Sequence, residues 1–240
     1  MVEVASRPRP RSALGAVLAS RLVRDDVEEL YDYDAVRALP TATVFVVRPA
    51  GPTIVLGGSQ PLEVLDAGVG ARAVRRRRGG GGAVLLQPED VWIDWWLPAD
   101  DERWSPDVHV MSQRVGEWWC DVVSARVEGD VAVHRSALGG NPAFRVACFA
   151  GRGPGEVFVD DRKAVGLTQW RVREGVFVST VMHAHSSARL LETFRDVPPG
   201  LGEALNHHVT SSLGLDGDEL TAALIIRSGP ITVRHLLLIA

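Results

Sequence analysis

The segment GEVFVDDRKAVGLTQWRVREGVFVSTVM, residues 155–182, decides the fold class. Apolar and polar residues alternate on both sides of two turn signals, Asp160–Asp161 and Arg173–Gly175. A period of two is typical of strands with one buried face, and a short polar turn between two such runs predicts a hairpin. We therefore predict two successive hairpins, with Lys163 at the start of their central strand.

Similar patterns extend the prediction to the rest of the chain. β-branched and apolar runs predict further strands at residues 42–48, 53–56, 91–98, 131–138 and 144–151, and a pairing or docked segment at 231–240. Apolar spacings of three and four, with start and stop signals, predict helices at about residues 27–40, 106–127, 201–213 and 217–226. This order predicts an α+β fold in which helices flank a mainly antiparallel or mixed sheet, rather than a doubly wound fold.

Composition limits the classes of protein that the chain could be. With 240 residues, of which 46% are hydrophobic and 23% charged, it resembles a globular domain, and a net charge of −4 excludes general attraction to nucleic acid or membrane. No linker divides it, so we predict one domain over residues 1–240, with residues 1–24 as a loose or partly helical extension. Two cysteines and a longest N-terminal apolar run at 13–18 predict a cytoplasmic location without a membrane span.

Two features suggest chemistry. Arg75–Arg78 are followed directly by Gly79–Gly82, and backbone N–H groups of glycines beside guanidinium groups can bind a phosphate or carboxylate. A solvated basic loop is the alternative interpretation. The second feature is Lys163, the only lysine among the 26 basic residues. An ammonium acts as a compact point charge, whereas a guanidinium is a planar fork of donors, so this position favours a role that arginine cannot fill.

These two features together resemble a known family. The segment Arg76–Val84 resembles the signature loop R-R-x-x-G-G-G-A-V of the lipoate protein ligases and related octanoyl transferases, and Arg162–Gln169 resembles their G-R-K-I-x-G-S-A-Q motif. The resemblance covers about residues 40–185 and implies the fold of the biotin/lipoate protein ligase catalytic domain. The chain departs from the pattern at Gly79, where the family has serine, and at Leu85–Asp90, where the ligases have a His-Asp pair.

The resemblance also implies site residues. Lys163 is expected at the reacting carbonyl, where an ammonium stabilises the developing negative charge. Cys148, in a C-F element similar to that of one branch of octanoyl transferases, is the candidate nucleophile, with a small core residue as the alternative; Cys120 is expected to be structural. The donor or its adenylate is expected to contact the two arginines, the glycine loop and the strand after it, and the second motif, namely Arg76, Arg77, Gly80, Gly81, Gly82, Ala83, Val84, Leu85, Gly166 and Gln169.

The implied function is transfer of a lipoyl or octanoyl group to a lysine of a lipoyl-acceptor domain. We expect an ATP-dependent lipoate protein ligase that forms an acyl-adenylate with ATP and Mg²⁺. The alternatives are an ATP-independent octanoyl transferase that takes octanoate from an acyl carrier protein onto Cys148, and a non-catalytic binding module. No third ligand accompanies His183 and His185, so no metal site is predicted beyond the Mg²⁺ of ATP.

Overall fold

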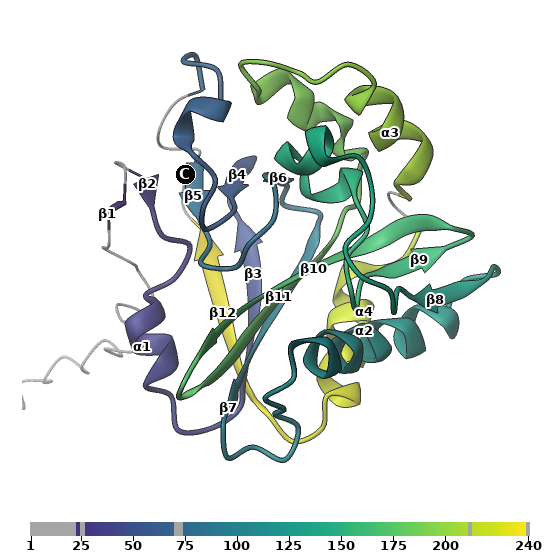
Figure 1. Cartoon of the computed structure of the whole chain (residues 1–240). Helices are drawn as coiled ribbons and strands as arrows, with labels where there is room; N and C mark the ends of the chain where they lie inside the picture. Colours follow the sequence, from purple (N-terminus) through teal and green to yellow (C-terminus); the bar gives the residue numbers. More distant parts are fainter. Residues whose placement is uncertain (1–22, 25–26, 70–73, 211–212, 239–240) are drawn as a thin grey trace, which may run out of the picture.

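The computed structural model describes residues 23–24, 27–69, 74–210 and 213–238. A seven-stranded sheet dominates this part of the chain (Figure 1). Its strands, from edge to edge, are β12 (Thr232–Leu238), β3 (Thr43–Pro49), β7 (Val91–Pro98), β11 (Gly175–Met182), β10 (Arg162–Val172), β9 (Val157–Val159) and β8 (Val131–Val133). Neighbours are antiparallel except for the parallel pair β12–β3. The predicted α+β class with a mixed sheet is confirmed.

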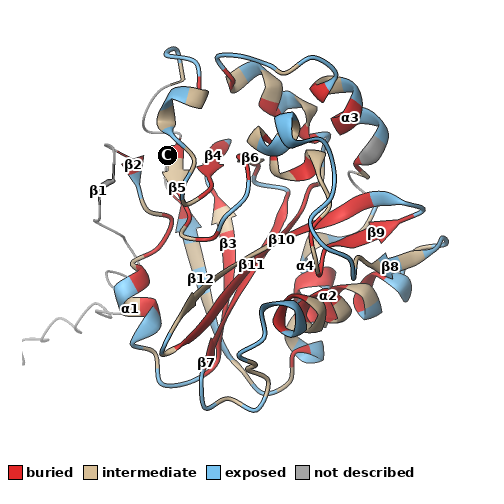
Figure 2. Cartoon of the chain, viewed as in Figure 1, coloured by how far each residue is buried: buried red, intermediate tan, exposed pale blue. Residues whose placement is uncertain are grey.

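The large sheet is buried on both faces, as Figure 2 shows for its central strands. Along β7, Ile93 and Trp95 face helices α2 (Val108–Ser124) and α4 (Gly217–Arg227) in one apolar core. Their neighbours Trp92 and Trp96 belong to a second core on the opposite face. Side chains of a strand alternate between the two faces of a sheet, so an almost entirely apolar strand fits this central position.

The second core is completed by smaller elements. A three-stranded sheet has the order β5 (Val74–Arg76), β4 (Thr53–Leu56), β6 (Val84–Leu86), and β1 (Val23–Arg24) pairs with β2 (Val27–Glu28). The remaining helices are α1 (Tyr33–Arg37), α3 (Leu201–His208) and the 3₁₀ helices η1 (Leu62–Val64), η3 (Pro142–Val146), η4 (Cys148–Ala150) and η5 (Ser187–Thr193). None of the helices in the described ranges is long and apolar enough to cross a bilayer.

Several predicted elements are confirmed and several are wrong. Both hairpins of residues 155–182 form, and helix α2 is present, with Asp107 as its N-cap. The predicted helix at 27–40 is shortened to α1, because β2 pairs with β1 at Val27 and Glu28. The strand predicted at 131–138 is shortened to β8, and most of the N-terminal extension lies outside the described residues.

The strand predicted at residues 144–151 is also wrong, because the chain forms the 3₁₀ helices η3 and η4 there. Pro142 has no N–H for a strand ladder and stands at the first turn of η3, and Asn141 caps that turn. Only Ala147 has an extended pairing, an isolated bridge with Ala83. This irregular segment carries Cys148.

A buried carboxyl group lies in the middle of β7. Asp94 is fully buried; the Tyr31 hydroxyl donates to it at 2.6 Å, and the Thr180 N–H donates at 3.3 Å. Burial raises the pKa of Asp94 to about 7, and these hydrogen bonds oppose the shift only in part. The folded state therefore holds a proton that the unfolded chain has released above its ordinary pKa of 3.8.

The predicted consequence is a loss of stability as pH rises. Because the pKa is raised on folding, Asp94 reduces the free energy of unfolding between about pH 4 and pH 7, by up to about 1.4 kcal/mol per pH unit. Asp94→Asn keeps an acceptor for Tyr31 and cannot ionise, so its stability should fall less than that of the wild type over this range. Urea unfolding of both proteins at pH 5 and pH 7.5 measures the difference; equal pH dependence would contradict the assignment.

Candidate active site

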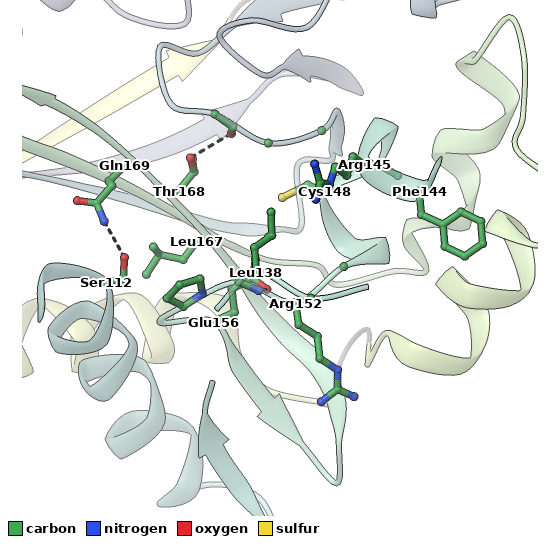
Figure 3. A pocket seen from close by; sticks show the side chains of 18 of the residues that line it. Ser112, Leu138, Phe144, Arg145, Cys148, Arg152, Glu156, Leu167, Thr168 and Gln169 are labelled. Atoms are coloured by element: carbon green, nitrogen blue, oxygen red, sulfur yellow. Dashed lines mark hydrogen bonds between the residues drawn. The ribbon is translucent and has the colours of Figure 1, made fainter. Parts of the chain in front are cut away.

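A cavity of about 570 Å³ opens where three segments meet (Figure 3). One segment is the glycine loop, defined here as Gly79–Gly82, which contributes Gly80 to Gly82. The second is the Cys148 turn, defined as Cys148–Gly151, and the third is the part of β10 from Leu167 to Gln169. The volume lies in the range of pockets that enclose small-molecule ligands, so this cavity is the candidate active site.

Arg77 holds the glycine loop through hydrogen bonds to its backbone carbonyls. Its side chain is buried, and its guanidinium donates to the carbonyl oxygens of Val55 at 3.1 Å, Gly80 at 2.9 Å and Gly82 at 2.7 Å. Burial lowers the pKa of Arg77. Because a guanidinium presents several donors in one plane, the Arg77 side chain can connect Gly80 and Gly82 of the loop to the neighbouring strand β4. Arg77 does not line the large cavity.

Arg76 has a similar place. It is buried, and its guanidinium donates to the carbonyl oxygens of Gly57 and Gln60. Arg76 and Arg77 were both expected to contact the donor, and neither lines the large cavity. Arg77 thus binds carbonyl groups of the glycine loop, whereas Arg76 binds carbonyl groups of the turn at residues 57–60. Binding of the donor by either arginine stays a prediction.

The glycine loop packs directly on the segment that carries Cys148. A Cβ atom at Gly82 would lie 2.4 Å from the Arg145 carbonyl oxygen and 2.7 Å or less from backbone carbons of Val146 and Ala147. Ala83 N–H donates to the Val146 carbonyl at 2.8 Å, and the Ala83 carbonyl accepts from Cys148 N–H at 3.0 Å. Only glycine permits this approach between two backbones.

The second motif reaches the same place from β10. The Thr168 hydroxyl donates to the Gly80 carbonyl at 3.0 Å, and the Gln169 amide donates to Ser112 Oγ at 2.6 Å, which connects the cavity to helix α2. A Cβ atom at Gly166 would lie 2.9 Å from the Phe149 ring, so glycine is required for this contact as well. The structure thus brings the two sequence motifs together at one cavity.

The residues after the glycine loop are less directly involved. Ala83 and Val84 are buried, Leu85 is half-buried, and none of the three lines the large cavity. Val84, together with Arg77 and Gly166, lines a small inner cavity of about 10 Å³ that adjoins Cys148. That space has room for about one water molecule and not for an aliphatic chain. An acyl chain bound in this conformation would therefore lie outside this inner space.

Cys148 is half-buried, and its sulfur points into the large cavity (Figure 3). Cys120 lies elsewhere: its thiol is 3.5 Å from the Val131 carbonyl oxygen, between α2 and β8. Burial raises the pKa of the Cys120 thiol. A thiol acts as a nucleophile through its thiolate, so the placement of Cys148 favours chemistry and that of Cys120 does not.

Lys163 is buried, and the adjacent Arg162 is exposed. Its ammonium donates to Glu156 Oε1 at 2.5 Å and to the carbonyls of Cys148 at 2.9 Å and Gly151 at 3.2 Å. It lies 5.0 Å from the centre of the Phe149 ring. Lys163 therefore contacts the Cys148 turn through the backbone carbonyls at its two ends. Its side chain also lines a smaller cavity of about 200 Å³. Its expected contact with the reacting carbonyl stays a prediction.

Sequence reasoning missed most of the cavity wall, including the polar residues Ser112, Arg145 and Glu156. Glu156 is fully buried, and burial raises its pKa while the charge of Lys163 lowers it. The sequence holds a signal for the pairing of Glu156 with Lys163. Glu156 begins the first predicted hairpin and Lys163 follows the hairpin turn, so the prediction places the two residues on neighbouring strands. Arg145 carries no such signal, because it belongs to the segment predicted wrongly as a strand.

The histidines do not form a metal centre in the described part of the chain. His183 is buried and contacts Asp90 at 2.9 Å, whereas His185 is exposed. No group of three or more histidine, cysteine, aspartate or glutamate side chains is placed to hold a metal ion among the described residues. His183 instead packs against Phe149, with 4.4 Å between the ring centres and the rings tilted by 51°, and so supports the Cys148 turn.

Two glycine substitutions test the packing of the loop. Gly82→Ala should lower stability by about 1–3 kcal/mol and distort the cavity, because its Cβ atom would overlap a backbone that cannot move freely. Gly80→Ala is the matched control, because nothing lies within 4 Å of the added atom. Thermal or urea unfolding of both variants measures the difference. Equal stability of the two variants would show that the backbone contact is not tight.

Comparison with known proteins gives no sequence match: no protein-family model and no curated protein matches the chain. Solved structures do match. An archaeal lipoylation system from Thermoplasma acidophilum, a bi-partite lipoate protein ligase and its E2 lipoyl domain, aligns with a TM-score of 0.63 at 16% identity over 86% of this chain and 79% of that chain. The T. acidophilum protein Ta0514 with bound lipoic acid gives 0.62 at 16% identity, over 86% and 81%. Lipoate-protein ligase A bound with ATP gives 0.59 at 17% identity, over 82% and 76%. At these identities the likeness establishes the fold, and this chain has the fold of the lipoate protein ligases.

Proposed function

We propose that this protein is an enzyme that transfers an octanoyl or lipoyl group to a lysine amine of a lipoyl-acceptor domain. The observation that carries the proposal is the convergence of the glycine loop, Cys148 and the strand from Leu167 to Gln169 at one cavity of about 570 Å³. The fold supports it, because one structure that shares the fold contains bound lipoic acid and another is a ligase with its E2 lipoyl domain. The acceptor is therefore expected to be a lipoyl domain.

The geometry favours a route through Cys148. The thiolate attacks the carbonyl carbon of an acyl thioester, the carrier thiol leaves with a proton, and an acyl-cysteine remains. The acceptor amine then attacks this acyl group; the new amide bond forms, the bond to sulfur breaks, and the amine proton goes to the departing thiolate or to water. Cys148 is the only thiol among the described residues that line the cavity, which suits this role. An acyl carrier protein is the expected donor.

A ligase route is the second candidate, because one structure with the same fold is bound with ATP. Backbone N–H groups of Gly80 to Gly82 could contact phosphate oxygens, and ATP would supply the energy to activate a free carboxylate as an acyl-adenylate. Mg²⁺ prefers carboxylate and phosphate oxygens. Glu156 is the only carboxylate among the described residues that line the cavity, and Lys163 already occupies one of its oxygens. The cavity is thus better suited to a thioester donor than to Mg·ATP.

A donor experiment separates the routes. The purified protein is incubated with a lipoyl domain and either octanoyl carrier protein or lipoate with Mg·ATP. We expect octanoyl transfer from the carrier, a mass increase of one octanoyl group on Cys148, and loss of both in Cys148→Ser. Cys120→Ser is the matched control and should behave as wild type.

The other outcomes of this experiment are equally informative. Pyrophosphate release with lipoate, together with transfer that survives Cys148→Ser, would replace the thioester route by the ligase route. A failure to modify the lipoyl domain with either donor would contradict enzymatic acyl transfer, and it would favour a non-catalytic module that binds an acyl or nucleotide ligand.

Lys163→Arg tests the need for an ammonium in this site. The side chain of Lys163 is 2% exposed, so the larger guanidinium should lower stability by about 1–3 kcal/mol. It should also reduce transfer strongly, because a planar group cannot direct donors to the same three acceptors. Activity is measured at a temperature where the variant is folded, judged by circular dichroism. Wild-type turnover in the folded variant would show that the position needs only a positive charge.

A further inference from the structure

The ion pair of Lys163 and Glu156 lies in the wall between two cavities. Glu156 lines the larger cavity, and Lys163 lines the smaller one of about 200 Å³. Their side chains are only 2% and 5% exposed, and the atoms Nζ and Oε1 are 2.5 Å apart. The pair is therefore shielded from solvent, and each charge depends on the other.

The pair also connects three segments of backbone. The Lys163 ammonium donates to the carbonyls of Cys148 and Gly151, which are the two ends of the Cys148 turn. The second carboxylate oxygen of Glu156 accepts from Gly153 N–H at 2.7 Å. The start of β10, the Cys148 turn and the loop that leads into β9 thus meet at one pair of charges. All three ammonium protons have an acceptor, so the ammonium has no proton to spare for a ligand in this conformation.

The position of the ammonium depends on the carboxylate. A buried ammonium without a negative partner is strongly unfavourable, and it would move toward solvent or lose its proton. Arg152 lines both cavities, but its guanidinium donates to exposed Asp161 at 2.7 Å and not to the carbonyls that Lys163 holds. Without Glu156, the carbonyls of Cys148 and Gly151 would therefore lose the donor that holds them.

We propose that Glu156 is a positioning residue for acyl transfer: through Lys163 it fixes the Cys148 turn, and with it the place of the thiol in the cavity. The inference rests on the proposed function as far as transfer is concerned. The structural part, that Glu156 holds the turn, stands independently of any substrate.

The test compares Glu156→Gln with Glu117→Gln. The control removes one negative charge from an exposed ion pair with Arg135, and neither residue of that pair lines the two cavities. Two quantities are measured for each folded variant: hydrogen exchange of the amides at Cys148, Ala150 and Arg152, and kcat and KM for the donor that the wild type accepts. The amides of Cys148, Ala150 and Arg152 donate to the carbonyls of Ala83, Ala147 and Gly139, so they report on the order of the turn.

In Glu156→Gln we expect faster exchange at these three amides and a fall in kcat of about a hundredfold, with a smaller change in donor KM, because a displacement near 1 Å at the reacting group has that effect. Glu117→Gln should match the wild type in both measurements. Wild-type exchange in a folded Glu156→Gln protein would overturn the structural part, and unchanged kcat would overturn the part on transfer.

Two further cases are treated separately: a Glu156→Gln variant that does not fold, and a wild-type protein that transfers no acyl group. If Glu156→Gln does not fold, Glu156→Asp replaces it; the shorter side chain keeps the charge but cannot reach Lys163 and Gly153 together, so faster exchange and lower kcat are again expected, and wild-type values of both would overturn the proposal. If the wild type transfers no acyl group from either donor, the proposed function fails, and the exchange measurement alone decides whether Glu156 holds the turn.

Discussion

The contact between the backbone at Gly82 and the backbone at Arg145–Ala147 is the constraint on which the candidate site depends. The contact closes only without a side chain, since a Cβ atom would lie 2.4 Å from the Arg145 oxygen. Through it the three-stranded sheet, whose strands β5 and β6 are connected by the glycine loop, is joined to the segment that carries Cys148. These two segments form the cavity together with residues Leu167–Gln169 of β10. The surrounding contacts, from Arg77 inside the loop and from Lys163 behind the turn, maintain this arrangement.

The parts of the fold that sequence predicts well are those with a regular pattern. The hairpins of residues 155–182 and helix α2 each have a regular spacing of apolar residues, and this spacing predicts them. The Cys148 turn has no such pattern. The turn belongs to residues 144–151, FRVACFAG, which are as apolar as those of a strand, and only the proline and asparagine before them, with the partner backbone at Ala83, favour the 3₁₀ helices.

The candidate site also has parts that the sequence predicts and parts that it does not. The two motifs come together at one cavity, which their resemblance to a family implies and which composition does not. The partners of individual side chains were not predictable, because they depend on distances between segments. Arg76 and Arg77 illustrate this: a run of arginines beside glycines suggests ligand binding, yet both guanidinium groups contact carbonyl oxygens of the surrounding loops. Glu156 was missed for the same reason, because its role depends on the ion pair with Lys163.

The retention of a single lysine in an arginine-rich chain now has a physical account that is independent of catalysis. Three acceptors, the Glu156 carboxylate and the carbonyls of Cys148 and Gly151, converge on one nitrogen atom within 2.5–3.2 Å. A tetrahedral ammonium can serve acceptors arranged around a point, whereas the donors of a guanidinium lie in one plane and spread over several ångströms. Elsewhere in the chain the acceptors are arranged for that fork, as Arg77 and Arg103 show. The geometry of its acceptors therefore suffices to select lysine at position 163, even before any contact with a reacting carbonyl is considered.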